Sequence, residues 1–288
     1  MATLRDIKRR ITSIKSTSKI TRAMKMVSAA KLRRAQERMF ALRPYSDKMR
    51  EVLLSLAQPG EQDRHPLLRI RPRKTVEVLT LTSDKGLCGA FNTNVLKAGL
   101  RLVKDLENEG FETSISTLGR KAGDYFKRRN IPVRQAWTGL SGKISYTSAQ
   151  EIAVVLMDKY INETFDELYL VYNEFKSVAS QKVTKLRLLP LGEVEHEEED
   201  EMKDFLFEPS EAEIFNRLLP KSVEIQLYRT MLESRVSEEA ARMTAMENAT
   251  QSAEDMIDRL TLEYNKARQA TITRELMDIV GGAEAIND

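Results

Sequence analysis

The chain has 288 residues, of which 41% are hydrophobic and 31% charged, and its formal net charge is +3. No stretch approaches the roughly 18 uninterrupted apolar residues of a membrane span, and the charged start MATLRDIKRR does not fit a secretory signal, so we expect a protein of the cytosol or of a membrane surface. Cys88 is the single cysteine, which excludes an internal disulfide and a cysteine-based zinc cluster.

The first predicted element is a long N-terminal helix, in a segment that we place at residues 1–58. No glycine or proline occurs from Met1 to Arg43, and after Pro44 none occurs until Pro59. Apolar residues alternate spacings of three and four, as in a coiled coil. The positions in this register are Leu4, Ile7, Ile11 and Ile14, and further along Leu32, Ala35, Met39 and Leu42.

The middle of this helix breaks the apolar register. The register positions there are Ser18, Thr21, Lys25 and Ser28. The apolar residues lie instead on a neighbouring stripe, which consists of Ile20, Ala23, Met24, Val27 and Ala30. The helix therefore either shifts its seam or presents apolar surface to a second partner.

The central segment, residues 74–208, alternates strand and helix patterns, which predicts an α/β domain with a mostly parallel, Rossmann-like sheet. The predicted strands are 75–84, 111–119, 131–137, 166–175 and 181–191, and the predicted helices are 92–110, 120–130 and 147–165.

The turn SDKGLCGAFN, residues 83–92, follows the first predicted strand, where a phosphate-binding loop would lie. Gly86 and Gly89 do not spell GxGxxG or a P-loop, so we interpret the segment as a strand-to-helix turn. Asp84 and Lys85 lack a convergent set of catalytic partners, and two histidines, His65 and His196, leave little for acid–base chemistry. We therefore expect no catalytic residue, no bound cofactor and no metal site.

An acidic run, GEVEHEEEDEMKD at residues 192–204, precedes the last segment and is typical of a solvated linker or loop. The last segment, residues 210–288, lacks glycine and proline from Lys221 to Val280, between Pro220 and the pair Gly281 and Gly282. Sixty helical residues would extend about 90 Å. The apolar positions along this helix are Val223, Leu227, Val236, Met243, Met246, Met256, Ile257, Leu260, Tyr264, Ala267 and Ile279.

The charges of the two ends are opposite. Residues 1–50 carry fifteen Lys and Arg against three Asp and Glu, a balance of +12, whereas residues 221–288 carry eight against thirteen, a balance of −5. An antiparallel coiled coil of the N-terminal and C-terminal helices satisfies both the apolar seam and the charges. A nucleic-acid-binding coiled coil is an alternative, although the acidic helix would compete with phosphates for the basic one. A nucleotide-dependent α/β enzyme that uses the central sheet is the other alternative.

Three motifs carry a family resemblance: ITRAMKMVSAAKLRRAQ at 20–36, SDKGLCGAFN at 83–92 and ARQATITRELMDIVGGAEAI at 267–286. The sequence resembles the gamma subunit of F-type ATP synthase, and the lone cysteine fits a bacterial member rather than a redox-switched chloroplast one. The resemblance implies a non-catalytic rotor of the central stalk, one copy per complex, inside a ring of three alpha and three beta subunits. It also implies contact with the epsilon subunit and the c ring, coupling of proton or sodium flow to ATP synthesis, and no nucleic-acid partner.

The resemblance further implies a peripheral location at the cytoplasmic face of the cell membrane, with membrane association only through the c ring. It also implies contact residues. Those toward the alpha and beta ring are Met24, Lys25, Arg33, Arg34, Arg242, Gln269, Thr273 and Glu275, and those toward epsilon and the c ring are Phe205, Phe207 and Glu208. Without the resemblance, an arginine on a long helix is usually solvated or paired to a neighbour, and a methionine such as Met24 usually belongs to a core.

Overall fold

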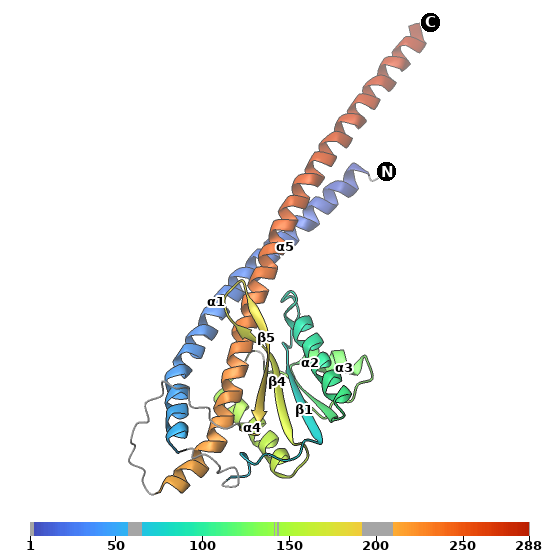
Figure 1. Ribbon diagram of the computed structural model, residues 1–288. Coiled ribbons are helices and arrows are strands. Elements are labelled where there is room, and N and C mark those ends of the chain that lie inside the picture. Colours follow the sequence, from blue (N-terminus) through green and yellow to red (C-terminus); the bar gives the residue numbers. More distant parts are fainter. Residues whose placement is uncertain (1–2, 57–64, 141, 143, 192–209, 288) are drawn as a thin grey trace. The chain divides into compact units, whose positions relative to one another are not determined.

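The computed structural model describes residues 3–56, 65–140, 142, 144–191 and 210–287 (Figure 1). The chain falls into two compact units, one of Met1–Ser28 with Met243–Asp288 and one of Ala29–Arg242. The domain boundaries predicted at residues 58 and 208 lie outside the described residues, so the division into 1–58, 74–208 and 210–288 stays a prediction.

A five-stranded sheet lies in the unit of Ala29–Arg242, with the strand order β3-β2-β1-β4-β5. The strands are β1 (Thr75–Leu81), β2 (Glu112–Leu118), β3 (Gln135–Trp137), β4 (Glu167–Phe175) and β5 (Gln181–Leu189). The pairs β1–β2, β1–β4 and β2–β3 are parallel, and β4–β5 is antiparallel. This confirms the predicted mostly parallel sheet. Strand β3 is shorter than predicted, since the N–H of Ile131 bonds to the carbonyl of Phe126 at the end of the preceding helix.

Helices cover both faces of the sheet (Figure 1). Helices α2 (Phe91–Asn108) and α3 (Arg120–Lys127) pack on one face, where Val76 and Val78 of β1 meet Val95, Val103 and Phe126. Helix α4 (Tyr146–Ile161) packs on the other face together with part of the C-terminal helix. Crossovers between parallel strands therefore place helices on both faces, as this topology requires.

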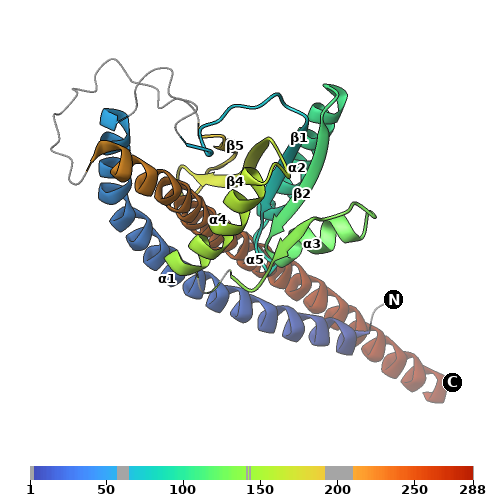
Figure 2. The ribbon, with the colours of Figure 1, turned by 90° about the horizontal axis from the view of Figure 1, so that it is seen from below.

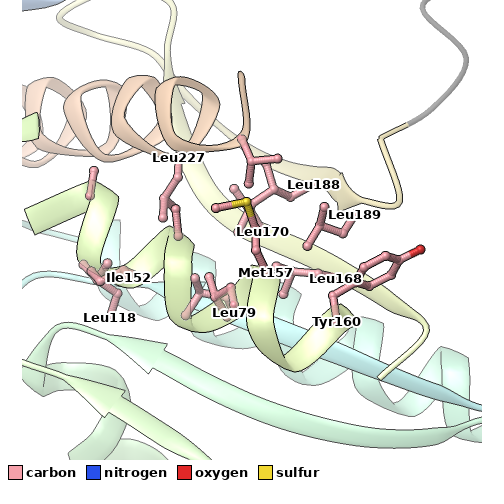
Figure 3. Packing of buried hydrophobic residues seen from close by; sticks show 14 of the residues in the cluster. Leu79, Leu118, Ile152, Met157, Tyr160, Leu168, Leu170, Leu188, Leu189 and Leu227 are labelled. Atoms are coloured by element: carbon pink, nitrogen blue, oxygen red, sulfur yellow. The ribbon is translucent and has the colours of Figure 1, made fainter. Parts of the chain in front are cut away.

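The core between the sheet, α4 and the C-terminal helix α5 (Glu211–Asn287) is closely packed (Figure 3). Leu79 and Leu170 come from the sheet, Met157 and Tyr160 from α4, and Leu227 from α5. Tyr160 is completely buried, and its hydroxyl donates a hydrogen bond of 2.7 Å to the carbonyl of Arg69. The C-terminal helix is therefore part of the core of this unit.

The two terminal helices are α1 (Leu4–Leu56) and α5 (Glu211–Asn287), both seen along their length in Figure 2. Helix α5 extends beyond the sixty residues that are free of glycine and proline, because it begins before Pro220 and continues through the glycine pair. Pro220 removes one backbone hydrogen bond. Around it, Phe215 and Leu219 are buried against Met49 and Leu53 of α1, and this packing outweighs the loss.

Candidate functional site

Within the unit formed by Met1–Ser28 and Met243–Asp288, side chains of the two terminal helices contact each other. The cross-helix contacts are Thr21 Oγ1 to Thr250 Oγ1 at 2.7 Å, Arg22 Nη2 to Glu254 Oε1 at 2.5 Å and Lys25 Nζ to Glu247 Oε1 at 2.6 Å. Position 25 of α1 meets position 247 of α5, whereas position 22 meets position 254. The pair is therefore antiparallel with a basic and an acidic helix, as the sequence predicts.

The seam of this pair is polar at its middle positions. Ser18, Thr21 and Ser28 are buried, and Ser28 is only 2% exposed. The hydroxyl of Thr21 also bonds to the carbonyl of Ser18 at 3.0 Å, and that of Thr250 to the carbonyl of Met246 at 2.8 Å. The buried hydroxyls of Thr21 and Thr250 are thus satisfied, and the heptad register continues through polar residues without a shift.

The same unit exposes several large apolar side chains. Ile20, Met26 and Val27 of α1 are 60%, 69% and 52% exposed. Of the two alternatives that the sequence leaves open, the structure shows the second: the seam stays in place and the apolar stripe faces outward. Helix α5 also exposes large apolar side chains, namely Met256, Leu262, Ile272, Leu276, Met277, Ile279 and Val280. Such a surface is typical of a protein-binding site.

The predicted contact residues of this unit lie in two separate places. Met24 is half-buried, and Lys25 is half-buried in its ion pair with Glu247. The other predicted contacts, Gln269, Thr273 and Glu275, are exposed on α5. Because 22 residues separate Glu247 from Gln269, about 33 Å of helix lies between the two groups. The structure does not bring them together.

The three arginines predicted as contacts in the other unit differ in their surroundings. Arg33 is exposed and pairs with Glu37 one helical turn away at 3.1 Å. Arg34 is exposed and borders a cavity. Arg242 is buried and pairs with acids of its own helix. For Arg242 the structure therefore agrees with the alternative interpretation of an arginine paired to its neighbours, and its contact with a partner stays a prediction.

The partners of Arg242 form a buried ion-pair cluster on α5 that consists of Arg235, Glu238, Glu239 and Arg242. Arg235 lies 2.9 Å from Glu238 and 2.5 Å from Glu239, and Arg242 lies 2.6 Å from Glu238 and 3.1 Å from Glu239. Burial acts to lower the pKa of Arg242, but the two carboxylates outweigh burial and raise it. Of this cluster only Arg242 is among the residues predicted from the sequence, although the spacings of three, four and seven residues between its members are a usable signal.

The turn after β1 is held by its own side chains. The N–H of Ser83 donates to Asn92 Oδ1 at 2.9 Å, and Asp84 Oδ1 accepts from the N–H groups of Arg120 at 2.9 Å and Gly139 at 3.2 Å. Burial raises the pKa of the Cys88 thiol, which disfavours the reactive thiolate. The segment is therefore a strand-to-helix turn that is fixed by hydrogen bonds of its own side chains.

Helix α5 passes close to this turn. A space of about 20 Å³ is bordered by Thr82 and Leu118, at the ends of β1 and β2, and by Arg235 and Glu238 of α5. In open α/β sheets the carboxyl ends of the strands are the usual place for a ligand. In this unit α5 and its buried ion-pair cluster lie at that edge.

Metal-binding and membrane-spanning features are absent from the described residues. Among them, no three His, Cys, Asp or Glu residues are grouped so as to hold a metal ion, and no helix has the length and apolar character to cross a membrane. The predicted contact residues Phe205, Phe207 and Glu208, together with His196, lie outside the described residues.

Comparison with known proteins gives consistent matches. The sequence model of the ATP synthase family, described as "ATP synthase", matches residues 3–286. The ATP synthase gamma chain of Pelotomaculum thermopropionicum is 46% identical over 286 residues, which cover 99% of this chain and 100% of the relative. That of Geobacter metallireducens is also 46% identical over 286 residues, at 99% coverage of both chains.

Two solved structures extend the comparison. A chain from the Tetrahymena thermophila mitochondrial ATP synthase central stalk and c-ring structure has a TM-score of 0.58 and 26% identity, covering 80% of this chain and 99% of that one. A chain of the Euglena gracilis mitochondrial ATP synthase has a TM-score of 0.69 at 22% identity, covering 98% and 94%, and this second likeness concerns the fold alone.

Proposed function

The chain belongs to the ATP synthase gamma-chain family, and on this premise we propose that it turns as the rotor of the enzyme. As a gamma chain it is a non-catalytic subunit of the central stalk, and catalysis takes place at the beta subunits. Rotation would couple proton or sodium flow through the c ring to ATP synthesis or hydrolysis.

The exposed apolar surface of the terminal helices carries this proposal. Ile20, Met26 and Val27 face outward from a pair whose seam is closed by Thr21, Thr250 and two cross-helix ion pairs. Because the two helices contact each other through polar groups, their exposed apolar side chains are available to bind a surrounding partner. We assign that partner as a ring of three alpha and three beta subunits, around one copy of this chain.

The contacts with the ring would involve the residues that the family resemblance implies. Met24 belongs to the apolar stripe and Lys25 is next to it in the sequence, and Arg33 and Arg34 follow two turns later on α1. An asymmetric pair of helices turning among three beta subunits would favour a different conformation in each, and so a different nucleotide affinity. Gln269, Thr273 and Glu275 would contact the ring further along α5.

The remaining assignments concern the other end of the complex. The α/β unit would face the epsilon subunit and the c ring, with Phe205, Phe207 and Glu208 as contact residues. The subunit would be peripheral, at the cytoplasmic face of the membrane, and associated with the bilayer only through the c ring. In support, the similar Tetrahymena chain comes from a structure of a central stalk and c ring.

A reversible crosslink tests rotation. In a Cys88→Ser background, Asn248→Cys on the exposed surface of α5 is joined by a disulfide to an engineered cysteine of the ring in the assembled enzyme. We expect the crosslink to abolish ATP synthesis and reduction with dithiothreitol to restore it, because the helix pair could no longer turn against the ring.

A second position serves as the comparison. Val280→Cys lies near the end of α5, where twisting of the helix could absorb part of the rotation, so a crosslink there is the weaker test. Full ATP synthesis with the Asn248→Cys crosslink in place would contradict the rotor function. Inhibition that persists after reduction would show damage other than the crosslink.

A further inference from the structure

A cavity of about 270 Å³ lies in the unit of Ala29–Arg242, between α1, α5 and the chain segment before α4. We call it the basic cavity. Its lining residues are Lys31, Arg34, Ala35, Arg38, Gly142, Ile144, Leu232 and Arg235. Four of these carry a positive charge at neutral pH, and none of the described lining residues is acidic.

The charge of the basic cavity is concentrated on one face of α1. Lys31, Arg34 and Arg38 follow one another at spacings of three and four residues, which places them on the same side of the helix. Among the ion pairs of the described residues, none involves these three side chains. By contrast, the adjacent Arg33 is paired with Glu37.

The fourth cation differs in that its charge is already balanced. Arg235 is bound to Glu238 and Glu239 of the buried ion-pair cluster, and its side chain is 16% exposed. It therefore forms a fixed wall of the cavity, while the three residues of α1 leave an uncompensated charge of +3. Like charges that converge on a concave surface raise the local concentration of anions.

We propose that the basic cavity binds a phosphoryl oxyanion of the size of inorganic phosphate or pyrophosphate. Arginine forks and a lysine ammonium are the side chains that hold phosphate oxygens. The volume lies below the roughly 300–1,000 Å³ of sites for larger organic ligands, which favours a small anion over an acidic peptide. This site goes beyond the rotor function, because the isolated chain would bind the anion without turning.

Isothermal titration of the isolated full-length chain tests the site. We expect saturable one-to-one binding of pyrophosphate, weaker binding of phosphate, and loss of both as the KCl concentration rises. A separate titration uses magnesium-free ATP. Competition between ATP and pyrophosphate identifies the polyphosphate of a nucleotide as a ligand source, and its absence restricts the site to the free oxyanion.

Substitutions test whether pyrophosphate binds in the basic cavity. Arg34→Gln should weaken pyrophosphate binding about tenfold, and the double variant with Arg38→Gln about a hundredfold, as each removes a charge-assisted contact. The matched control Arg33→Gln, which removes the adjacent but paired charge, should change affinity less than about twofold. Gly142→Glu places a carboxylate at the cavity without altering α1 and should abolish binding. A Cβ atom at Gly142 meets nothing within 4 Å, so that variant should fold.

Three results would overturn the proposal. The first is no saturable binding of pyrophosphate up to about 10 mM, an affinity too weak for a built site. The second is an equal loss in Arg33→Gln and Arg34→Gln, which would reveal diffuse attraction to a basic helix. The third is binding of a poly-glutamate peptide with no binding of pyrophosphate, which would make the basic cavity a peptide site. None of these results bears on rotation.

Discussion

Removing Arg242 should destabilise the isolated chain far more than removing an ordinary surface arginine. Glu238 and Glu239 are 5% and 1% exposed at their side chains, and Arg242 is one of the two cations that neutralise them. Breaking a buried ion pair costs about 3–5 kcal/mol because a charge is left in a poorly solvated place. Since Arg235 still contacts both acids, we expect Arg242→Ala to lower the free energy of unfolding by about 3 kcal/mol.

Urea unfolding at neutral pH measures this loss. Trp137, the single tryptophan of the chain, lies in β3 and is packed against the core shared by the sheet and α5, so its fluorescence reports the unfolding of this unit. The matched control is Arg229→Ala on the same helix. Arg229 pairs with Glu233 at 3.0 Å but is 46% exposed, so its loss should cost no more than about 1 kcal/mol.

A second substitution that restores the charge balance of the cluster tests this explanation. In Arg242→Ala the buried cluster carries one excess negative charge, so adding Glu239→Gln should recover most of the lost stability. Equal losses for Arg242→Ala and Arg229→Ala would refute the reasoning, as would further destabilisation by Glu239→Gln.

Three further predictions concern the seam, the pH dependence and the turns. Thr21→Val and Thr250→Val should each cost about 1 kcal/mol in local opening measured by hydrogen exchange, whereas the double variant should cost less than their sum, because each single change leaves a hydroxyl facing a methyl group. Additive losses would contradict the hydroxyl contact. Burial lowers the pKa of His65 from its ordinary 6.5, so the folded state resists protonation and stability should fall as the pH drops through 6.5. His65→Gln should flatten this dependence in urea unfolding, and an unchanged slope would assign it to other groups. Gly119→Ala should cost at least about 2 kcal/mol by the same assay, because a Cβ atom there would lie 2.1 Å from a backbone oxygen at a φ of +102°, whereas Gly110→Ala, at +92° with open space, should cost less.

The elements of the α/β unit follow from local sequence patterns. Strand β1 is predicted at 75–84 and spans Thr75–Leu81, and α2 is predicted at 92–110 and spans Phe91–Asn108. Alternating and helical spacings of apolar residues determine such elements, since each face must be buried. The uninterrupted passage of α5 through Pro220 could not be predicted in this way, because it depends on packing against Met49 and Leu53, which are distant in the sequence.

The buried ion-pair cluster and the basic cavity also differ in whether local sequence patterns can predict them. The buried ion-pair cluster lies on one helix, so the spacing of Arg235, Glu238, Glu239 and Arg242 contains the information needed to find it. The basic cavity is lined by residues from the segments 31–38 and 232–235, together with Gly142 and Ile144. Only the tertiary structure brings these three segments together, and no local pattern in the sequence marks them as neighbours.

The polar seam and the exposed apolar stripe on α1 are consequences of one constraint. A helix has a limited apolar surface, and residues that fill a seam between two helices are not available to a third partner. From Ser18 to Ser28 the seam positions other than Lys25 carry small hydroxyl side chains, of which that of Thr21 contacts Thr250 across the pair. Ile20 and Val27 are thereby left at the surface, where a partner can bury them. Exchanging the two sets, with apolar seam residues and polar outer ones, should tighten the helix pair and weaken its binding to the ring of alpha and beta subunits that we propose as its partner.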